Sequence, residues 1–133
     1  FRLAEGGTTL LVSTHYMDEA ERCHRLAILD HGAKVADGTP EELKASTGMH
    51  VVEVHASDSF AAQKVIAEIP GVVSVTQLGI RLRILMPVEI DSPAKRVRQR
   101  LLEQGIEADT SLSTAGLEDV FVAVTLKPEQ KAA

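Results

Sequence analysis

The chain contains few cysteines and few aromatic residues. Its 133 residues include one cysteine (Cys23), one tyrosine, three phenylalanines and no tryptophan. A single cysteine excludes a disulfide within the chain and any zinc site built from several cysteines, which fits a reducing compartment. With so few aromatic rings, we expect no surface that stacks nucleic-acid bases or sugars.

Long apolar runs and an excess of basic residues are also absent. No run approaches the roughly 20 apolar residues that a transmembrane helix needs, and the first residues lack the composition of a signal segment. We therefore expect a soluble, non-secreted chain. The formal net charge is −5, and the basic residues Arg96, Arg98 and Arg100 fall within an expected helix. Nucleic acid is therefore not an expected partner.

The first residues predict the end of a helix followed by a buried strand. Residues 1–5 have the pattern of the last turns of a helix, which Gly6 and Gly7 end. Residues 8–13 are apolar on both faces, as is typical of a strand buried in a parallel sheet. One such strand cannot be buried alone, so we expect a truncated piece of a longer protein, with its first 15 residues disordered, rearranged or paired with a second copy.

A short helix, a hairpin and a second helix are expected next. Residues 16–24 predict a short polar helix. Residues 25–29 and 34–36 predict two strands joined through a turn of Asp30, His31 and Gly32. Thr39 is then expected to cap a helix that has Pro40 at its first position, with Glu42 completing a capping box. This helix is expected to end near residue 46.

The pattern changes after residue 48. Strands are expected at 50–55, 72–77, 80–86 and 106–112, and helices at 60–69 and 94–104, the second capped by Ser92. The strand over 80–86 alternates, and the face with Arg81, Arg83 and Leu85 is expected to meet solvent. The opposite, apolar face consists of Ile80, Leu82, Ile84 and Met86. The order β-α-β-β-α-β is that of a ferredoxin-like domain with two helices on one face.

The expected fold class is therefore α+β, with domains at 1–47 and 49–126. A last helix over 116–125 carries an apolar stripe that must pack on another element, and residues 127–133 are expected to form a frayed tail. The stripe consists of Leu117, Val120, Phe121 and Val124.

His15 is the leading candidate for chemistry, because it follows an apolar strand at the end where α/β sheets place ligands and catalytic groups. A purely structural hydrogen bond is the plainer interpretation of a lone histidine. Asp18, Glu19 and Glu21 are most simply a solvated helix face, although they leave open a metal site with His15 or His24.

Other polar residues have simpler explanations. Cys23 beside His24 has the composition of an activated thiol, but no third group orients the pair, so a small, partly buried cysteine is preferred. His50 and His55 lie an odd number of residues apart on one strand and face opposite sides. Arg81 and Arg83 are a solvated surface or a docking patch, and we favour the surface.

Three segments resemble one family in the same order. Residues 11–21 (LVSTHYMDEAE) resemble the switch-histidine segment of ATP-binding cassette (ABC) ATPases, and residues 27–43 (AILDHGAKVADGTPEEL) resemble the hairpin and helix that close the nucleotide-binding domain of that family. Residues 116–121 (GLEDVF) are similar to the terminal helix of subunits that work with ABC-2 type exporters. The first match begins at residue 11 and the last ends at residue 121, so together they span most of the length of the chain.

The resemblance implies that His15 is a catalytic residue, which contacts the ATP γ-phosphate and helps to position water or stabilise charge in the full-length subunit. It implies ATP and Mg²⁺ as cofactors of that subunit. This sequence has no phosphate-loop motif, no strand ending in the Asp-Glu pair that holds magnesium, and no signature motif. We therefore expect the fragment itself to be inactive and to bind no cofactor.

The resemblance also implies partners and a location. A second nucleotide-binding subunit and a transmembrane permease are the expected partners, in the cytoplasm at the inner face of the cell membrane, in an exporter driven by ATP hydrolysis. The isolated chain is expected to self-associate. Two alternatives stay open: a stand-alone ferredoxin-like module for ligand binding or dimerisation, and a small metal-dependent hydrolase that uses His15, Asp18 and His24.

Overall fold

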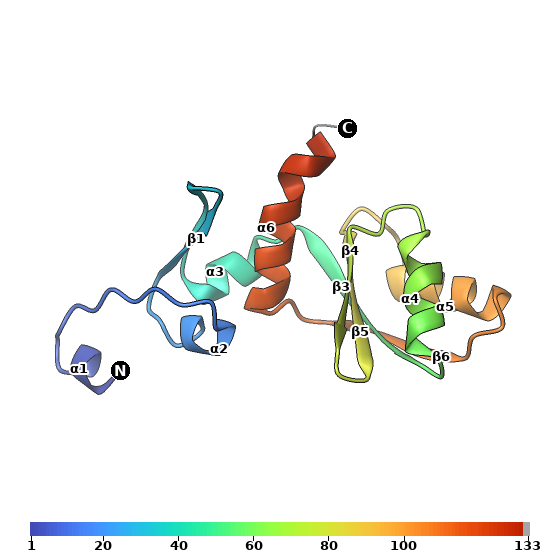
Figure 1. Cartoon of the computed structure of the whole chain (residues 1–133), viewed down its shortest axis with the longest axis horizontal. Helices are drawn as coiled ribbons and strands as arrows, with labels where there is room; N and C mark the ends of the chain where they lie inside the picture. Colours follow the sequence, from blue (N-terminus) through green and yellow to red (C-terminus); the bar gives the residue numbers. More distant parts are fainter. Residues whose placement is uncertain (132–133) are drawn as a thin grey trace.

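The computed structural model describes residues 1–131, which fold as an α+β chain with two antiparallel sheets. The first part of the chain contains helices α1 and α2, the strands of a hairpin and helix α3; the second part contains a four-stranded sheet and three helices (Figure 1). In chain order the first part is α1 (Arg2–Glu5), α2 (Met17–Ala20), β1 (Leu26–Asp30), β2 (Ala33–Gly38) and α3 (Pro40–Ala45). The second part is β3 (Met49–Ala56), α4 (Ser59–Ala67), β4 (Ser74–Leu78), β5 (Arg81–Pro87), α5 (Pro93–Glu103), β6 (Ala108–Ser113) and α6 (Leu117–Lys131).

The strand expected over residues 8–13 does not form. The segment runs as irregular chain between α1 and α2, and Leu10, Leu11 and Val12 are 48%, 101% and 60% exposed. A strand needs backbone partners, and among the described residues the β1–β2 hairpin pairs only with itself. The apolar residues that predicted a buried strand are therefore exposed to solvent.

The predicted hairpin and the helix after it are confirmed. Strands β1 and β2 pair antiparallel, and the connecting residues His31 and Gly32 have φ angles of 47° and 78°, the left-handed values that a tight type I′ turn requires. Helix α3 has the expected capping box: Thr39 Oγ1 accepts from the Glu42 amide at 3.1 Å, and the Glu42 carboxylate accepts from the Thr39 amide at 2.9 Å. Helix α2, expected over residues 16–24, is shorter than that, because it ends at Ala20.

The four-stranded sheet has the strand order β4-β5-β3-β6, and each neighbouring pair is antiparallel. Helices α4 and α5 cover one face (Figure 1). Alternate residues of the central strands point to these helices and are fully buried among them. The core side chains at this face include Val52, Val54, Leu82, Ile84, Met86, Ile66, Val97 and Leu101.

Helix α6 covers part of the other sheet face, which we expected to meet solvent. Ala123 of α6 packs with Val51 of β3 and Leu85 of β5, and all three are buried. The expectation of a one-sided sheet was wrong because the strand pattern cannot show that a helix far along the chain returns to this face. Ile80, expected on the apolar face, instead lies in the β4–β5 turn and is exposed.

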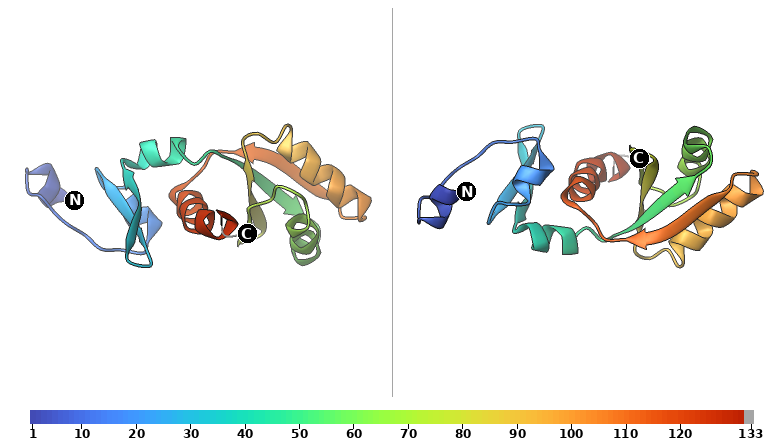
Figure 2. Two further views of the ribbon diagram at one scale, coloured as in Figure 1. Left: turned by 90° about the horizontal axis from the view of Figure 1, so that it is seen from above. Right: turned by 90° about the horizontal axis from the view of Figure 1, so that it is seen from below.

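Helix α6 also covers the first part of the chain. Its Leu117 and Val120 form a buried cluster with Ile28 of β1 and Leu43 of α3. In Figure 2, α6 lies between the hairpin on one side and the sheet on the other. The two parts of the chain therefore share this helix, although each has apolar contacts of its own.

Three expectations for the helices need correction. Ser92 occupies the N-cap position of α5, but its side chain makes no capping hydrogen bond and its backbone is left-handed (φ 50°). Phe121, expected in the apolar stripe of α6, is 40% exposed, whereas Leu117, Val120 and Val124 pack with the hairpin cluster. The last helix is longer than expected and ends at Lys131, and residues 132–133 of the expected tail lie outside the described residues.

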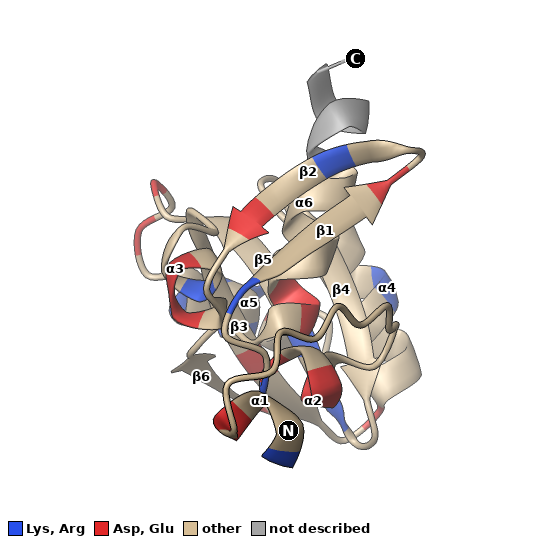
Figure 3. Ribbon diagram, turned by 90° about the vertical axis from the view of Figure 1, so that its left-hand side faces the viewer, with Lys and Arg blue, Asp and Glu red and all other residues tan. Residues whose placement is uncertain are grey.

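No helix in the described part of the chain combines the length and the apolar character needed to cross a membrane. Lys, Arg, Asp and Glu are interspersed at the hairpin end of the molecule (Figure 3). This end therefore shows no cluster of one charge.

We expect a shortened chain of residues 49–126 to melt cooperatively, because the cluster between the sheet and helices α4 and α5 draws all of its residues from that range. Circular dichroism during heating measures this. Within the shortened chain, Leu101→Ala should lower the free energy of unfolding by about 2–5 kcal/mol, since the side chain is fully buried. Leu102→Ala, at a 54% exposed neighbour, is the control. A broad, non-cooperative transition would contradict the prediction.

Candidate functional site

His15 lies on the surface, one residue before the N-cap of α2. Its ring lies beside that of Tyr16, with 4.1 Å between the ring centroids. Within the residues whose side chains are described, no hydrogen bond to the His15 imidazole is present. The two ring nitrogens are thus free to donate to or accept from a group outside the chain, such as a phosphate oxygen.

The residues on either side of His15 are held by one hydroxyl group. Thr14 Oγ1 accepts from the Tyr16 amide at 3.0 Å and donates to the Glu19 carboxylate at 2.5 Å. Glu19 belongs to α2, so the hydroxyl ties the backbone around His15 to that helix. The backbone next to His15 is therefore linked to α2, whereas the imidazole itself is exposed.

The remaining candidates near His15 do not assemble into a metal site. Across the described residues, no three His, Cys, Asp or Glu side chains lie close enough together to hold a metal ion. The Glu19 carboxylate accepts a hydrogen bond from the Thr14 hydroxyl, and Glu21 forms an ion pair with Lys44 at 2.9 Å. The hydrolase alternative, with His15, Asp18 and His24 around a metal, therefore has no support from the geometry.

The other polar residues singled out from the sequence lie apart from His15. Cys23 is partly buried, and its Sγ lies 3.5 Å from the Glu19 carbonyl oxygen. His50 and His55 are at opposite ends of β3 in the sheet, where His55 pairs across the strands with Asp109. They do not form a site together with His15.

The strongest polar constellation surrounds Arg83, at the place where α6 meets the sheet. Arg83 Nη2 and Nε contact the two Asp119 carboxylate oxygens at 2.7 and 3.3 Å, a two-pronged ion pair. Arg83 Nη1 also contacts Glu53, its cross-strand partner on β3. The Arg83 side chain is only 14% exposed, so the interpretation of Arg83 as a solvated surface residue was wrong.

Backbone groups complete this constellation. Arg83 Nη2 donates to the Thr114 carbonyl oxygen at 3.0 Å, and the Gly116 amide donates to Asp119 Oδ2 at 2.8 Å. The hydrogen bond from Arg83 to Asp119 is the main reason why the pKa of the Arg83 guanidinium is raised, even though burial acts in the opposite direction. The guanidinium therefore stays charged and holds the first turn of α6 against β3 and β5.

Sequence reasoning missed this constellation, although one signal was present. Glu53 of β3 and the two arginines of β5, Arg81 and Arg83, lie on the same face of neighbouring strands and have opposite charges. Their pairing follows once β3 and β5 are placed side by side. Nothing in the sequence alone connects Asp119 to them.

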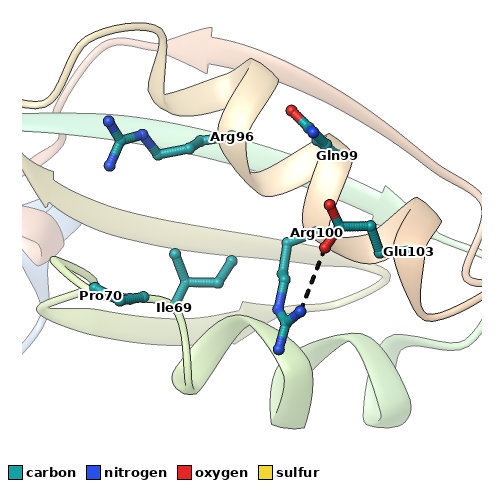
Figure 4. A pocket seen from close by; sticks show the side chains of 6 residues that line it. All are labelled: Ile69, Pro70, Arg96, Gln99, Arg100 and Glu103. Atoms are coloured by element: carbon teal, nitrogen blue, oxygen red, sulfur yellow. Dashed lines mark hydrogen bonds and ion pairs between the residues drawn. The ribbon is translucent and has the colours of Figure 1, made fainter.

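Two open grooves lie beside helix α5. One, of about 260 Å³, lies between the end of α4 and helix α5; it is lined by Ile69, Pro70, Arg96, Gln99, Arg100 and Glu103. Arg100 Nη1 forms an ion pair with Glu103 Oε2 at 3.3 Å, and the Arg96 side chain points away from that pair (Figure 4). The other, of about 430 Å³, is lined by His55, Ser57, Arg98, Leu102, Glu107, Ala108 and Asp109. Neither groove contains His15, and within the described residues no hydrogen bond joins Ser57 to His55 in the second groove.

Comparison with known proteins gives consistent relatives over nearly the whole chain. The daunorubicin/doxorubicin resistance ATP-binding protein DrrA of Streptomyces peucetius is 33% identical over 135 residues, covering 95% of this chain and 39% of the relative. The Nod factor export ATP-binding protein I of Paraburkholderia xenovorans is 36% identical over 121 residues, covering 90% of this chain and 37% of the relative. The daunorubicin resistance ATP-binding protein DrrA3 of Streptomyces coeruleorubidus is 35% identical, covering 92% and 40%.

The chain thus spans about two fifths of the length of the curated relatives that it matches. No family model matches the chain.

The Arg83 constellation leads to a stability prediction. We expect Arg83→Gln to lower the free energy of unfolding by about 3 kcal/mol, because the Asp119 and Glu53 carboxylates would stay largely buried without their cation. Arg81→Gln is the matched control: Arg81 contacts the same Glu53 but is 55% exposed, so its loss should cost less than about 1 kcal/mol. Denaturant unfolding measures both. Equal losses for the two variants would contradict a special role of Arg83.

Proposed function

Because this chain belongs to the ATP-binding subunits of ABC transporters, we propose that it is the C-terminal part of such a subunit and that the whole subunit couples ATP hydrolysis to export of a substrate. The observation that carries the proposal is the similarity, over at least nine tenths of the chain, to ATP-binding proteins named for drug resistance and for export. The export direction comes from those names and from residues 116–121, which resemble the terminal helix of exporter subunits.

His15 is the catalytic residue in this proposal. In the whole subunit its exposed imidazole would contact the ATP γ-phosphate and act by positioning and electrostatics, which is most of what phosphoryl transfer needs from a protein. The free ring nitrogens of His15 and the hydrogen bonds that link its neighbours to α2 support this role. The residues described do not form a site for ATP and Mg²⁺ on their own, so we propose that these bind to parts of the subunit that lie outside this sequence.

We further propose two domains, the end of the ATPase core at 1–47 and a ferredoxin-like accessory domain at 49–126. The strand order β4-β5-β3-β6, the antiparallel pairing and the position of α4 and α5 on one face support the ferredoxin-like assignment. Leu117 and Val120 of α6 pack with the hairpin and α3, and Ala123 of the same helix packs with the sheet. This helix is the expected site of contact between the domains.

The proposed partners are a second ATP-binding subunit and a transmembrane permease, which would place the whole subunit in the cytoplasm at the inner face of the membrane. The isolated chain is proposed to self-associate through residues 8–13, where Leu10, Leu11 and Val12 are exposed. Charged replacements of Leu10 and Val12 would then reduce the association.

An alternative function is a stand-alone module that binds a ligand or dimerises without catalysis. The complete core of the four-stranded sheet favours it, because such a unit can fold without an ATPase. The two functions differ in what they require of His15, which only the ATPase uses.

We expect His15→Ala in the whole subunit to lower kcat for ATP hydrolysis by about a hundredfold or more, with little change in KM, as is usual for the loss of one transition-state contact. Steady-state kinetics measures this. His24→Ala, a second exposed histidine just beyond α2, is the matched control and should leave kcat unchanged. Wild-type turnover in the His15 variant would remove His15 from the mechanism.

We expect the chain of 133 residues by itself to bind magnesium-ATP weakly or not at all, because its sequence contains no phosphate loop. Isothermal titration calorimetry with magnesium-ATP checks this. A dissociation constant in the micromolar range would mean that these residues hold a nucleotide site that we have not recognised.

A further inference from the structure

We propose that Arg83 and Asp119 are positioning residues for His15: their ion pair fixes helix α6 on the sheet, and α6 supports the segment that carries His15. The two ends of this connection lie in different parts of the chain, with His15 before α2 and Arg83 on β5. The catalytic consequence rests on the proposed function of His15. The mechanical connection is independent of that function and can be tested in this chain.

The first step is the attachment of α6 to the sheet. Asp119 lies in the first turn of α6 and accepts from both Arg83, on β5, and the Gly116 amide, just before the helix begins. Arg83 is itself held by Glu53 on β3 and by the Thr114 carbonyl group after β6. Two strands and the segment after β6 therefore fix the direction in which the first turn of α6 leaves the sheet.

The second step is the support that this same turn gives to α2. Leu117 and Val120 flank Asp119 in the sequence, and both are buried in the cluster with Ile28 and Leu43. Met17 and Ala20 of α2 pack against this cluster. A shift of the first turn of α6 would therefore remove the surface on which α2 rests, because close-packed side chains transmit small displacements.

The third step leads from α2 to His15. The Thr14 hydroxyl joins Glu19 of α2 to the backbone amide of Tyr16. Lys44 of α3 pairs with Glu21 just after α2 at 2.9 Å, and α3 also contacts α6. The backbone around His15 thus follows α2, and α2 and α3 together rest on α6. A misplaced catalytic group is costly, since a shift of about 1 Å can lower a rate by about a hundredfold.

Cys23 provides a reporter within the native sequence, because it is the sole cysteine of the chain and lies three residues after α2. Its thiol is partly buried and lies 3.5 Å from the Glu19 carbonyl oxygen. Loosening of α2 should expose this thiol to a labelling reagent. The rate of alkylation by iodoacetamide therefore reports on the His15 segment at a position that does not contact Arg83.

The experiment compares four forms of the chain: wild type, Arg83→Lys, Asp119→Asn and the control Arg81→Gln. Arg83→Lys keeps the positive charge but loses the two-pronged contact, and Asp119→Asn keeps an acceptor for the Gly116 amide. We expect both to raise the rate of Cys23 alkylation by about three- to thirtyfold, the range found for substitutions that alter coupling between sites. Arg81→Gln should label at the wild-type rate.

Amide exchange at Val54 separates local loosening from global unfolding. Val54 is fully buried in β3 on the helix-covered face of the sheet, so its amide reports on the sheet itself. A larger acceleration of Cys23 alkylation than of exchange at Val54, which also follows any loss of global stability, supports the proposal. An unchanged alkylation rate in Arg83→Lys, an equal rise in Arg81→Gln, or an equal acceleration at Val54 and Cys23 would each overturn it.

Kinetics of the whole subunit tests the catalytic consequence. Arg83→Lys should lower kcat by about three- to thirtyfold with KM for ATP unchanged, since it displaces His15 without touching the nucleotide. If His15→Ala lowers kcat but Arg83→Lys does not, the positioning role is wrong. If His15→Ala itself leaves kcat unchanged, the proposed function of His15 fails, whereas the Cys23 result stands or falls independently.

Discussion

The ion pair between Arg83 and Asp119 is the constraint on which the arrangement of this chain depends. A largely buried guanidinium loses its hydrogen bonds to water, and other acceptors must replace them. Here the acceptors are the carboxylates of Asp119 and Glu53 and the carbonyl oxygen of Thr114. Each group comes from a different element. The guanidinium has its N–H donors in one plane, so Asp119 can bind it only from a narrow range of directions. This restricts the orientation of α6, which carries Asp119. The apolar contacts of α6 can then form on both sides of the helix.

Features set by neighbouring residues could be predicted from the sequence. The capping box of Thr39 and Glu42, the turn at His31 and Gly32, and the order of the elements after residue 48 all follow from local chemistry. The burial of Leu82 and Ile84 followed from strand alternation. In the candidate site, the resemblance to a family selected His15. The structure adds that its imidazole is exposed and that Thr14 links the neighbouring backbone to α2.

Features that depend on distant contacts could not be predicted. Residues 8–13 have the composition of a buried strand, yet composition cannot supply the neighbouring strands that would bury Leu11. The interpretation of Arg83 as a solvated residue failed for a related reason, because its environment is created by Asp119, 36 residues further along the chain. In both cases the residue was judged on its own strand, whereas its burial is decided by which other element packs against that strand.

Helix α6 explains why the two parts of the chain are best regarded as one mechanical unit. Its apolar residues point in two directions, with Leu117 and Val120 toward the hairpin and Ala123 toward the sheet, as expected of a helix between two layers. Apolar contacts alone would let such a helix slide or rotate, since they have little directional preference. Asp119 provides the direction, because it lies in the same turn as Leu117 and Val120 and binds the sheet through Arg83. A change in the position of Arg83, for example on binding of a ligand or a partner to the sheet, would therefore shift the first turn of α6. The hairpin and α2, which pack on that turn, would shift with it.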